Sequence, residues 1–339
     1  MPAENRFYYG GRIESRYTAC ERSMIVEALP MDQVLSWGIG VVRVAQSFAS
    51  PALTLIMKGL SLAGTEFFFL AFLPLIYWCV DKRRGLRIGI LVFLSAVINL
   101  RLKLVFAQPR PYDLEPVLGM AKESTFGMPS GHAQASAVFA GSSSPLFRKP
   151  WGLVIALALP LLVGLSRIYL GVHFPTDVLA GWAIGAAIIG LDRVVGDRVE
   201  RFVTGLNDTL AIALVAAVAL AMNFLNMKDT SLSGVFFGFA GGAVFAKKRV
   251  LFSVSGTIRR RALRYLFGLA TVAIVYALPK LLLAAVEVDG PPLVRFLRYA
   301  LLGAWVTAGA PWLFLKMRLA DPEPRPHSET ENDGSVISK

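Results

Sequence analysis

The sequence predicts an all-α fold: a polytopic bundle of membrane-spanning helices preceded by an N-terminal interfacial helix. Of the 339 residues, 55% are hydrophobic and only 17% are charged, and the mean hydropathy of +0.56 lies well above that of soluble domains. The apolar residues form long runs, as membrane-crossing helices require. Lys and Arg, which give a net charge of +12, cluster between these runs rather than along one helix face. This pattern is typical of membrane proteins and argues against nucleic-acid binding.

The N-terminal segment, residues 1–59, is the least regular part of the chain. Residues 31–59 are moderately apolar but contain Arg43, Gln46 and Pro51, which are costly at the centre of a bilayer. We therefore expect an interfacial helix here, with a weak first span as the alternative. The preceding residues lack the short apolar core and cleavage site of a signal peptide, so no cleavable leader is predicted.

Apolar runs after residue 59 predict about nine spans, within a range of eight to ten. They are residues 60–80, 88–106, 131–146, 152–169, 175–191, 208–225, 231–246, 265–285 and 294–315. We divide this part of the chain into a core at 60–195, additional helices of unknown role at 196–317, and a polar tail at 318–339. The composition of the tail predicts disorder. The two cysteines, Cys20 and Cys79, support neither a disulfide framework nor a metal site.

The basic residues also predict which way the spans run. Those at 82–87, 148–149, 193–201 and 247–264 fall on one side of the predicted bundle, which the positive-inside rule assigns to the cytoplasm together with the tail. The loops at 107–130 and 170–174 then face outward. The Arg-bearing N-terminus would also lie outside, which conflicts with the rule.

Two of the three polar stretches on this outer face carry cations and a helix start. Lys103 and Arg110 are seven residues apart, two turns on one face if the helix persisted, but the prolines at 109 and 111 stop the helix. Two cations there can bind an anion or can simply extend to the interface. In Pro-Ser-Gly-His at 129–132, Ser130 is a natural N-cap, and Gly131 lets a ligand approach backbone amides that favour negative charge.

The third stretch, residues 166–177, combines a cation with a candidate nucleophile. Arg167 precedes His173 by six residues, and Asp177 follows that histidine by four. If Pro175 opens a helix, the carboxylate can bond one imidazole nitrogen and hold the other outward as a nucleophile or base. Each stretch alone fits ordinary capping of a membrane helix. Together they fit the binding and attack of a phosphoryl group.

These three stretches resemble, without a gap, the tripartite signature of the type-2 phosphatidic acid phosphatase superfamily. These lipid phosphate phosphatases share their active site with vanadium haloperoxidases. The signature reads Lys, six residues, Arg-Pro; then Pro-Ser-Gly-His; then Ser-Arg, five residues, His, three residues, Asp. The resemblance covers about residues 55–195. Gly-Thr-Glu at 64–66 and Tyr-Trp-Cys-Val-Asp at 77–81 are more loosely similar to the sphingosine-1-phosphate phosphatase branch and its bacterial relatives.

The resemblance implies a role for each residue of the signature. His173 would attack phosphorus to form a phosphohistidine, oriented by Asp177, and His132 would be the general acid for the departing lipid alkoxide and then the base for water. The phosphate oxygens would be bound by Lys103, Arg110, Ser130, the Gly131 amide and Arg167. No metal ion or other cofactor is implied.

The substrate expected from this resemblance is a membrane lipid with a phosphomonoester headgroup, such as a sphingoid-base phosphate or phosphatidate. A polyprenyl (undecaprenyl) diphosphate is the alternative, because Lys122 could reach a second phosphate. A lipid transporter or flippase that uses the motif as an anion site is an alternative of another class, suggested by the extra spans and Lys280. A transport site has no need for the oriented nucleophile that His173 and Asp177 provide.

We expect a bacterial inner membrane with the site facing the periplasm, or an ER membrane with a lumenal site in a eukaryote. The sequence leaves open whether the protein self-associates.

Overall fold

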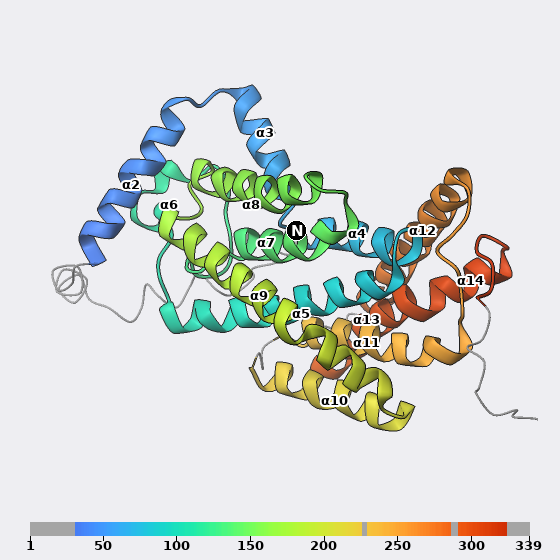
Figure 1. Cartoon of the computed structure of the whole chain (residues 1–339). Helices are drawn as coiled ribbons and strands as arrows, with labels where there is room; N and C mark the ends of the chain where they lie inside the picture. Colours follow the sequence, from blue (N-terminus) through green and yellow to red (C-terminus); the bar gives the residue numbers. More distant parts are fainter. Residues whose placement is uncertain (1–30, 226–228, 286–290, 324–339) are drawn as a thin grey trace, which may run out of the picture. The chain divides into compact units, whose positions relative to one another are not determined.

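A computed structural model describes residues 31–225, 229–285 and 291–323. Within these ranges the regular structure is helical apart from one isolated β-bridge (Figure 1). The chain packs as two units. Unit 1 comprises the chain up to Phe72 together with Ile88–Arg201, and unit 2 comprises Leu73–Arg87 together with the chain from Phe202 onward. All three polar stretches belong to unit 1.

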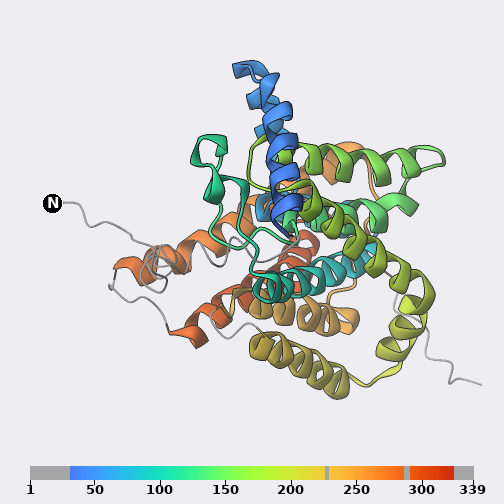
Figure 2. The same ribbon diagram turned by 90° about the vertical axis from the view of Figure 1, so that its left-hand side faces the viewer.

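Unit 1 contains most of the helices in the first two thirds of the chain. They are α2 (Met31–Ser47), α3 (Pro51–Leu62), the start of α4 (Glu66–Cys79), most of α5 (Lys82–Phe106), α6 (Pro111–Leu114), η1 (Pro116–Leu118), α7 (Gly131–Ser143), η2 (Ser144–Leu146), α8 (Trp151–Tyr169) and most of α9 (Pro175–Gly205). Helix α7 packs along α8, and α2 and α3 lie against α8 as well. Figures 1 and 2 show α7 and α8 side by side from two directions.

From residue 31, where the described part of the N-terminal segment begins, the chain forms two helices where we expected one interfacial helix, and that expectation is not confirmed. Ser50, in the short connection between the two helices, is the N-cap of α3, since its side chain accepts a hydrogen bond from the Leu53 amide. Pro51 occupies the first turn of α3, where its missing N–H costs nothing. Helices α3 and α4 meet at a bend of 54° and together are long and apolar enough for a broken span or a re-entrant loop.

The polar residues that interrupt this segment bind the loops of unit 1. The Gln46 amide group donates to the carbonyl oxygens of Leu118 at 2.8 Å and Tyr169 at 2.9 Å. Arg43 pairs with Glu115 at 2.7 Å. Helix α2 is therefore held against the rest of unit 1 by the same polar side chains that are costly at the centre of a bilayer.

The helices that qualify as membrane spans are fewer than the sequence predicted. Among the described residues, five are long and apolar enough: Lys82–Leu114, Trp151–Tyr169, Pro175–Gly205, Asp208–Leu225 and Ile258–Pro279; the bent pair makes up to six. The count of nine is not confirmed. Helix α7, with 13 residues, is only about 20 Å long at 1.5 Å per residue, short of a bilayer core of about 30 Å. Most of its residues are buried within unit 1.

Unit 2 contains the remaining helices, α10 (Asp208–Leu225), α11 (Ser231–Arg249), α12 (Ile258–Ala285), α13 (Pro292–Ala304) and α14 (Ala310–Lys316), with a π-helical turn at Trp305–Gly309. Helix α11 packs against α10 and, most extensively, against α13. Their backbones approach closely because glycine lies at the crossing: a Cβ on Gly238 would come within 1.8 Å of the Ala300 carbonyl oxygen. Small residues at such crossings are typical of helix pairs in membranes.

The start of the predicted tail is ordered. Phe252 and Pro322 form a β-bridge, Ser253 donates its amide to the Asp321 carbonyl at 2.8 Å, and Arg260 pairs with the Asp321 carboxylate at 2.7 Å. These contacts place residues 318–323 in the folded part of unit 2, while the rest of the tail lies outside the described residues.

The sequence also singles out the two cysteines and Lys280. Cys79 is buried and forms no disulfide, whereas Cys20 and the side chain of Lys280 lie outside the described residues.

Candidate active site

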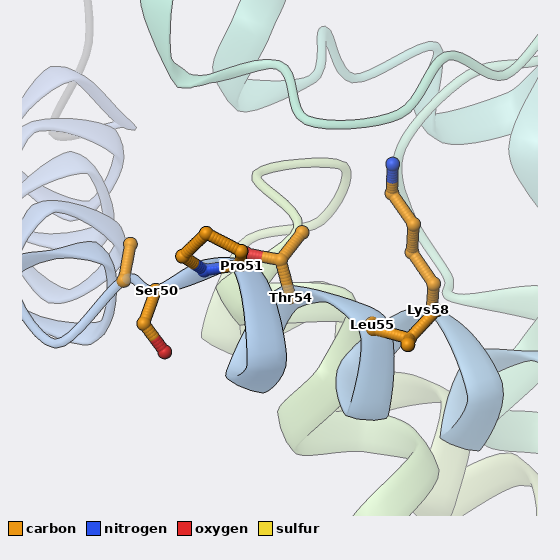
Figure 3. A pocket seen from close by; sticks show the side chains of 6 residues that line it. Ser50, Pro51, Thr54, Leu55 and Lys58 are labelled. Carbon is orange, nitrogen blue, oxygen red and sulfur yellow. The ribbon is translucent and has the colours of Figure 1, made fainter.

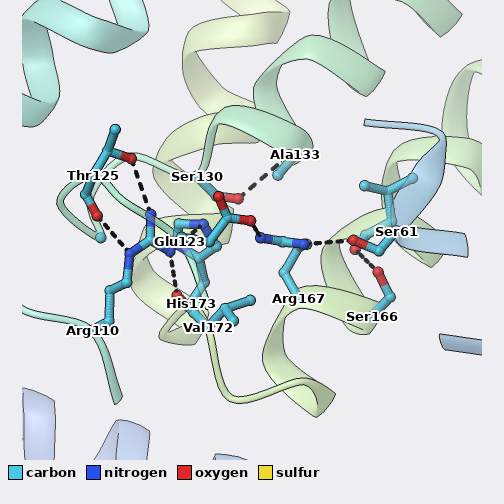
Figure 4. Close-up of polar contacts among 12 residues, drawn as sticks. Ser61, Arg110, Glu123, Thr125, Ser130, Ala133, Ser166, Arg167, Val172 and His173 are labelled. Carbon is cyan, nitrogen blue, oxygen red and sulfur yellow. Dashed lines mark hydrogen bonds and ion pairs between the residues drawn. The ribbon is translucent and has the colours of Figure 1, made fainter. Parts of the chain in front are cut away.

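The three polar stretches meet in unit 1 around the connection between α8 and α9 (Figure 4). The last turn of α5 supplies Lys103, the N-terminus of α7 supplies the Ser-Gly-His run, the end of α8 supplies Arg167, and the first turn of α9 supplies Asp177. The buried members of the predicted set are Lys103, Arg110, Ser130, Arg167, His173 and Asp177. Gly131 and His132 are half-buried. The structure thus brings all eight predicted site residues into one unit.

His173 and Asp177 form the pair that the sequence predicts. Pro175 begins α9, so Asp177 lies one turn from His173, and its Oδ2 is 3.1 Å from His173 Nδ1. The same oxygen accepts from the Phe174 amide at 3.0 Å. The other oxygen, Oδ1, accepts from Gln108 Nε2 at 2.7 Å. Three donors therefore fix the orientation of this carboxylate.

The neighbours of His173 determine which ring nitrogen carries the proton. Arg110 Nη1 lies 3.2 Å from His173 Nε2. A carboxylate can only accept and a guanidinium can only donate, so one tautomer satisfies both: Nδ1–H donates to Asp177, and the lone pair of Nε2 faces Arg110. Burial, followed by the positive charge of Arg110, lowers the pKa of His173 well below its ordinary value. The ring is therefore neutral, with its free electron pair directed at a cation.

Arg110 and Lys103 also fold the loop before α7 over this pair. Arg110 donates to the carbonyl oxygens of Thr125 at 2.7 Å, Phe126 at 3.0 Å and Val172 at 2.7 Å. Lys103 Nζ donates to the Phe126 carbonyl oxygen as well. Both cations are thus held at the site by backbone oxygens, and neither needs an acidic partner of its own.

Arg167 is held from two sides by residues outside the predicted set. Its Nη1 donates to Ser61 Oγ at 2.5 Å, and its Nη2 pairs with the carboxylate of Glu123. Ser61 belongs to α3 and lies outside all three polar stretches. Glu123 and Gln108 do lie in or beside them, and a polar residue within or next to a charged motif is the signal that would have found them.

His132 and the start of α7 complete the arrangement. Ser130 caps α7 by accepting from the Ala133 amide at 3.4 Å, and its own amide donates to the Asp177 carbonyl at 2.9 Å. Burial, followed by the positive charge of Arg167, lowers the pKa of His132 to about 3, although the negative charge of Glu123 raises it. Its ring nitrogens have no hydrogen-bond partner in the described part of the chain, so they are available to a ligand.

Glycine lies where the break between α3 and α4 reaches the site. A Cβ on Gly64 would lie 2.6 Å from the Cβ of His132, so this break packs directly on the histidine. A Cβ on Gly127 would lie 3.1 Å from Asp177 Oδ2. Both positions require close approach of the backbone, and the first of them belongs to a segment that the signature does not include.

A separate cavity of about 500 Å³ opens at the corner between α2 and α3, lined by Ala49, Ser50, Pro51, Thr54, Leu55 and Lys58. Figure 3 shows the Lys58 side chain extending away from α3. Thr54 is 2.8 Å from the hydroxyl of Tyr169. None of the predicted site residues lines this cavity, but Lys58 lies one helical turn from Ser61, on the helix that contacts Arg167.

Two family models match the chain. The model described as the PAP2 superfamily matches residues 84–198, the region of the three polar stretches. The model described as PAP2 superfamily phosphatase, transmembrane extension, matches residues 230–322. The second match accounts for most of unit 2, for which the sequence alone indicated no role.

Several proteins are similar to this chain over the same region. An undecaprenyl-diphosphatase of Sulfolobus acidocaldarius is 30% identical over 178 residues, covering 49% of this chain and 82% of that protein. Sphingosine-1-phosphate phosphatase 2 of Mus musculus is 33% identical over 136 residues, but the match spans only 38% of each chain. The crystal structure of a PAP2-type phosphatidylglycerolphosphate phosphatase from Bacillus subtilis is 26% identical, with a TM-score of 0.44, and covers 53% of this chain and 92% of that one.

Proposed function

Because this chain belongs to the PAP2 superfamily, we propose that it is an integral-membrane phosphatase that cleaves a lipid phosphate ester through a phosphohistidine. The observation that carries the proposal is the position of the His173 ring between Arg110 and Asp177, which together favour one tautomer. Its Nε2 lone pair faces Arg110 while Asp177 accepts from Nδ1–H. A neutral, oriented nucleophile among fixed cations is what phosphoryl transfer requires.

The first step forms the N–P bond between His173 Nε2 and the phosphoryl group and breaks the bond to the lipid oxygen. A bound phosphate ester places negative charge beside His132, which raises the pKa of this ring, and the protonated ring gives its proton to the departing alkoxide. The ring of His173 becomes positively charged as it attacks, and Asp177, which accepts from Nδ1–H, stabilises that charge. Arg110 Nη1, next to Nε2, is positioned to donate to a phosphoryl oxygen.

The second step returns the enzyme to its starting state. His132 takes a proton from water, the water oxygen attacks phosphorus, and the N–P bond breaks to release phosphate and the neutral His173. In both steps negative charge spreads over the equatorial oxygens, where Lys103, Arg110, Arg167, Ser130 and the Gly131 amide bind them. Fixed cations and amides supply the stabilisation that Mg²⁺ provides in other phosphoryl-transfer enzymes.

For the substrate, we propose a lipid phosphate monoester of the sphingoid-base phosphate or phosphatidate type. Glu123 supports a monoester because its carboxylate offsets part of the positive charge beside Arg167, which leaves less for a second phosphate. A polyprenyl diphosphate is the second candidate, and the similarity to the undecaprenyl-diphosphatase of Sulfolobus acidocaldarius favours it. The distribution of basic loops supports a site on the outer or lumenal face.

The proposal is tested by following phosphate on the enzyme. Purified protein in mixed micelles is given a phosphate-labelled long-chain monophosphate, and acid-labile, base-stable label on the protein is measured after rapid quenching. His173→Ala should lose this label and at least about three orders of magnitude in kcat. His327→Ala, the same substitution in the tail, is the matched control and should keep both. Near-normal hydrolysis by His173→Ala would exclude the mechanism.

A further inference from the structure

Glu123 is an acidic side chain placed among cations that are expected to bind phosphate. Its carboxylate pairs with Arg167 Nη2, and the charges of His132 and Arg110 also act on it. Figure 4 shows Glu123 beside Arg167 in the centre of the polar cluster. Among the described residues, no other Asp or Glu side chain forms an ion pair with one of the predicted phosphate-binding residues.

The main chain of Glu123 is fixed independently of this pair. The Tyr112 hydroxyl donates to the Glu123 carbonyl oxygen at 2.9 Å, and the Glu123 amide donates to the same hydroxyl at 3.1 Å. The backbone therefore stays in place when the side chain rotates. The side chain itself is 28% exposed, whereas that of Arg167 is 4% exposed, so the carboxylate has room to leave and the guanidinium does not.

Arg167 also keeps its position without Glu123, because Ser61 accepts from the other terminal nitrogen, Nη1. Burial raises the pKa of Glu123. The charges of Arg167, His132 and Arg110 lower this pKa by more than burial raises it, so the pKa lies below its ordinary value. The carboxylate is thus ionised at neutral pH. The carboxylate of Glu123 therefore occupies Arg167 Nη2, a hydrogen-bond donor that a phosphate oxygen would also use.

We propose that Glu123 competes with phosphate for Arg167, so that substrate and product phosphate bind only when its carboxylate swings away from Nη2. This inference rests on the proposed function, since it takes Arg167 as a phosphate ligand. A site that is competent for only a fraction of the time binds every ligand more weakly by that fraction. Glu123 therefore weakens the retention of inorganic phosphate, which three cations would otherwise hold tightly, and limits product inhibition.

The test replaces the charge but keeps the shape. Glu123→Gln should lower the inhibition constants of vanadate and inorganic phosphate and the KM of the lipid substrate by a common factor of about ten, without raising kcat. Glu115→Gln is the matched control: it removes a carboxylate from the same connection between α5 and α7, but one that pairs with Arg43 outside the cluster. It should leave all three constants within about two-fold.

A purely structural role for Glu123 gives the opposite sign. If the carboxylate only holds Arg167 and the loop in place, Glu123→Gln raises KM and both inhibition constants, and that result, or no change, overturns the inference. If Glu123→Gln does not fold, Glu123→Asp is read in the same way, because a shorter carboxylate reaches Arg167 less well. Hydrolysis by the wild-type protein with unchanged constants in the variants rejects the role of Glu123 alone. Absence of both hydrolysis and vanadate binding in the wild-type protein rejects the proposed function.

Discussion

Gln108 donates a hydrogen bond of 2.7 Å to Oδ1 of Asp177, on the side of the carboxylate opposite the contact with His173. Gln108 is itself buried. It follows the last turn of α5 and precedes Pro109, so the end of one helix orients the carboxylate at the start of another. The orientation of the proposed nucleophile thus depends on a side chain that hydrogen-bonds to the carboxylate of Asp177.

Removal of this hydrogen bond should slow chemistry more than binding. We expect Gln108→Leu to lower kcat about ten-fold with little change in KM, because Asp177 loses one of the three donors that orient it. Asp177→Asn should cost more, about a hundred-fold or greater, because an amide no longer selects the tautomer of His173. Steady-state kinetics in mixed micelles measure both. A wild-type kcat in Gln108→Leu would show that the other two donors suffice.

The central pair of the site was predictable because its geometry is local. The spacing of His173 and Asp177, with Pro175 between them, defines one turn at a helix start, and the structure has that turn. Ser61 and Gly64 were not predictable in the same way. They reach Arg167 and His132 only because α3 folds back onto α8, and no spacing within the three stretches encodes that contact.

The predicted fold was right in class and less accurate in its elements. Composition predicts the helical, apolar segments, but the sequence of α7 predicts a span because an apolar run does not distinguish a membrane helix from a buried one. The ordered residues around Asp321 were also missed. Their local composition resembles a disordered tail, and their order depends on Arg260, a partner about sixty residues earlier in the chain.

The charge arrangement of the site also predicts that the reaction needs no metal ion. Lys103, Arg110 and Arg167 can bind the phosphate oxygens directly, so activity should persist within about two-fold in excess EDTA. Vanadate should inhibit competitively, because it adopts the five-coordinate geometry of the transferring phosphoryl group. Initial rates with EDTA, with Mg²⁺ added back and across a vanadate series check this. Loss of activity in EDTA that Mg²⁺ restores would contradict it.

The predicted orientation can be measured by labelling in intact cells. In a background without Cys20 and Cys79, a cysteine at Val117, which is 86% exposed before α7, should react with a membrane-impermeant maleimide added from outside. A cysteine at Arg84, exposed at the start of α5, should react only after the membrane is permeabilised. A permeant maleimide, which should label both, is the control for accessibility. The reverse pattern would place the site on the cytoplasmic face.

Substrate preference depends on how much positive charge remains for a second phosphate. Glu123 offsets Arg167 on one side, and Lys122, the neighbouring residue, is exposed. We therefore expect a long-chain monophosphate or a glycerolipid phosphate to exceed a matched polyprenyl diphosphate in kcat/KM by at least about ten-fold. The comparison uses one purified preparation and equal surface concentrations in mixed micelles.

Lys122→Ala makes this comparison decisive. The variant should leave kcat/KM for the monophosphate within about two-fold, since an exposed cation outside the cluster would add little to a phosphate that three buried cations already bind. If the wild-type protein instead prefers the diphosphate ten-fold, and Lys122→Ala removes that preference, Lys122 binds the second phosphate and the substrate is a diphosphate. The roles of His173, His132 and Asp177 would be the same in either case, because both substrates present a terminal phosphoryl group to Nε2.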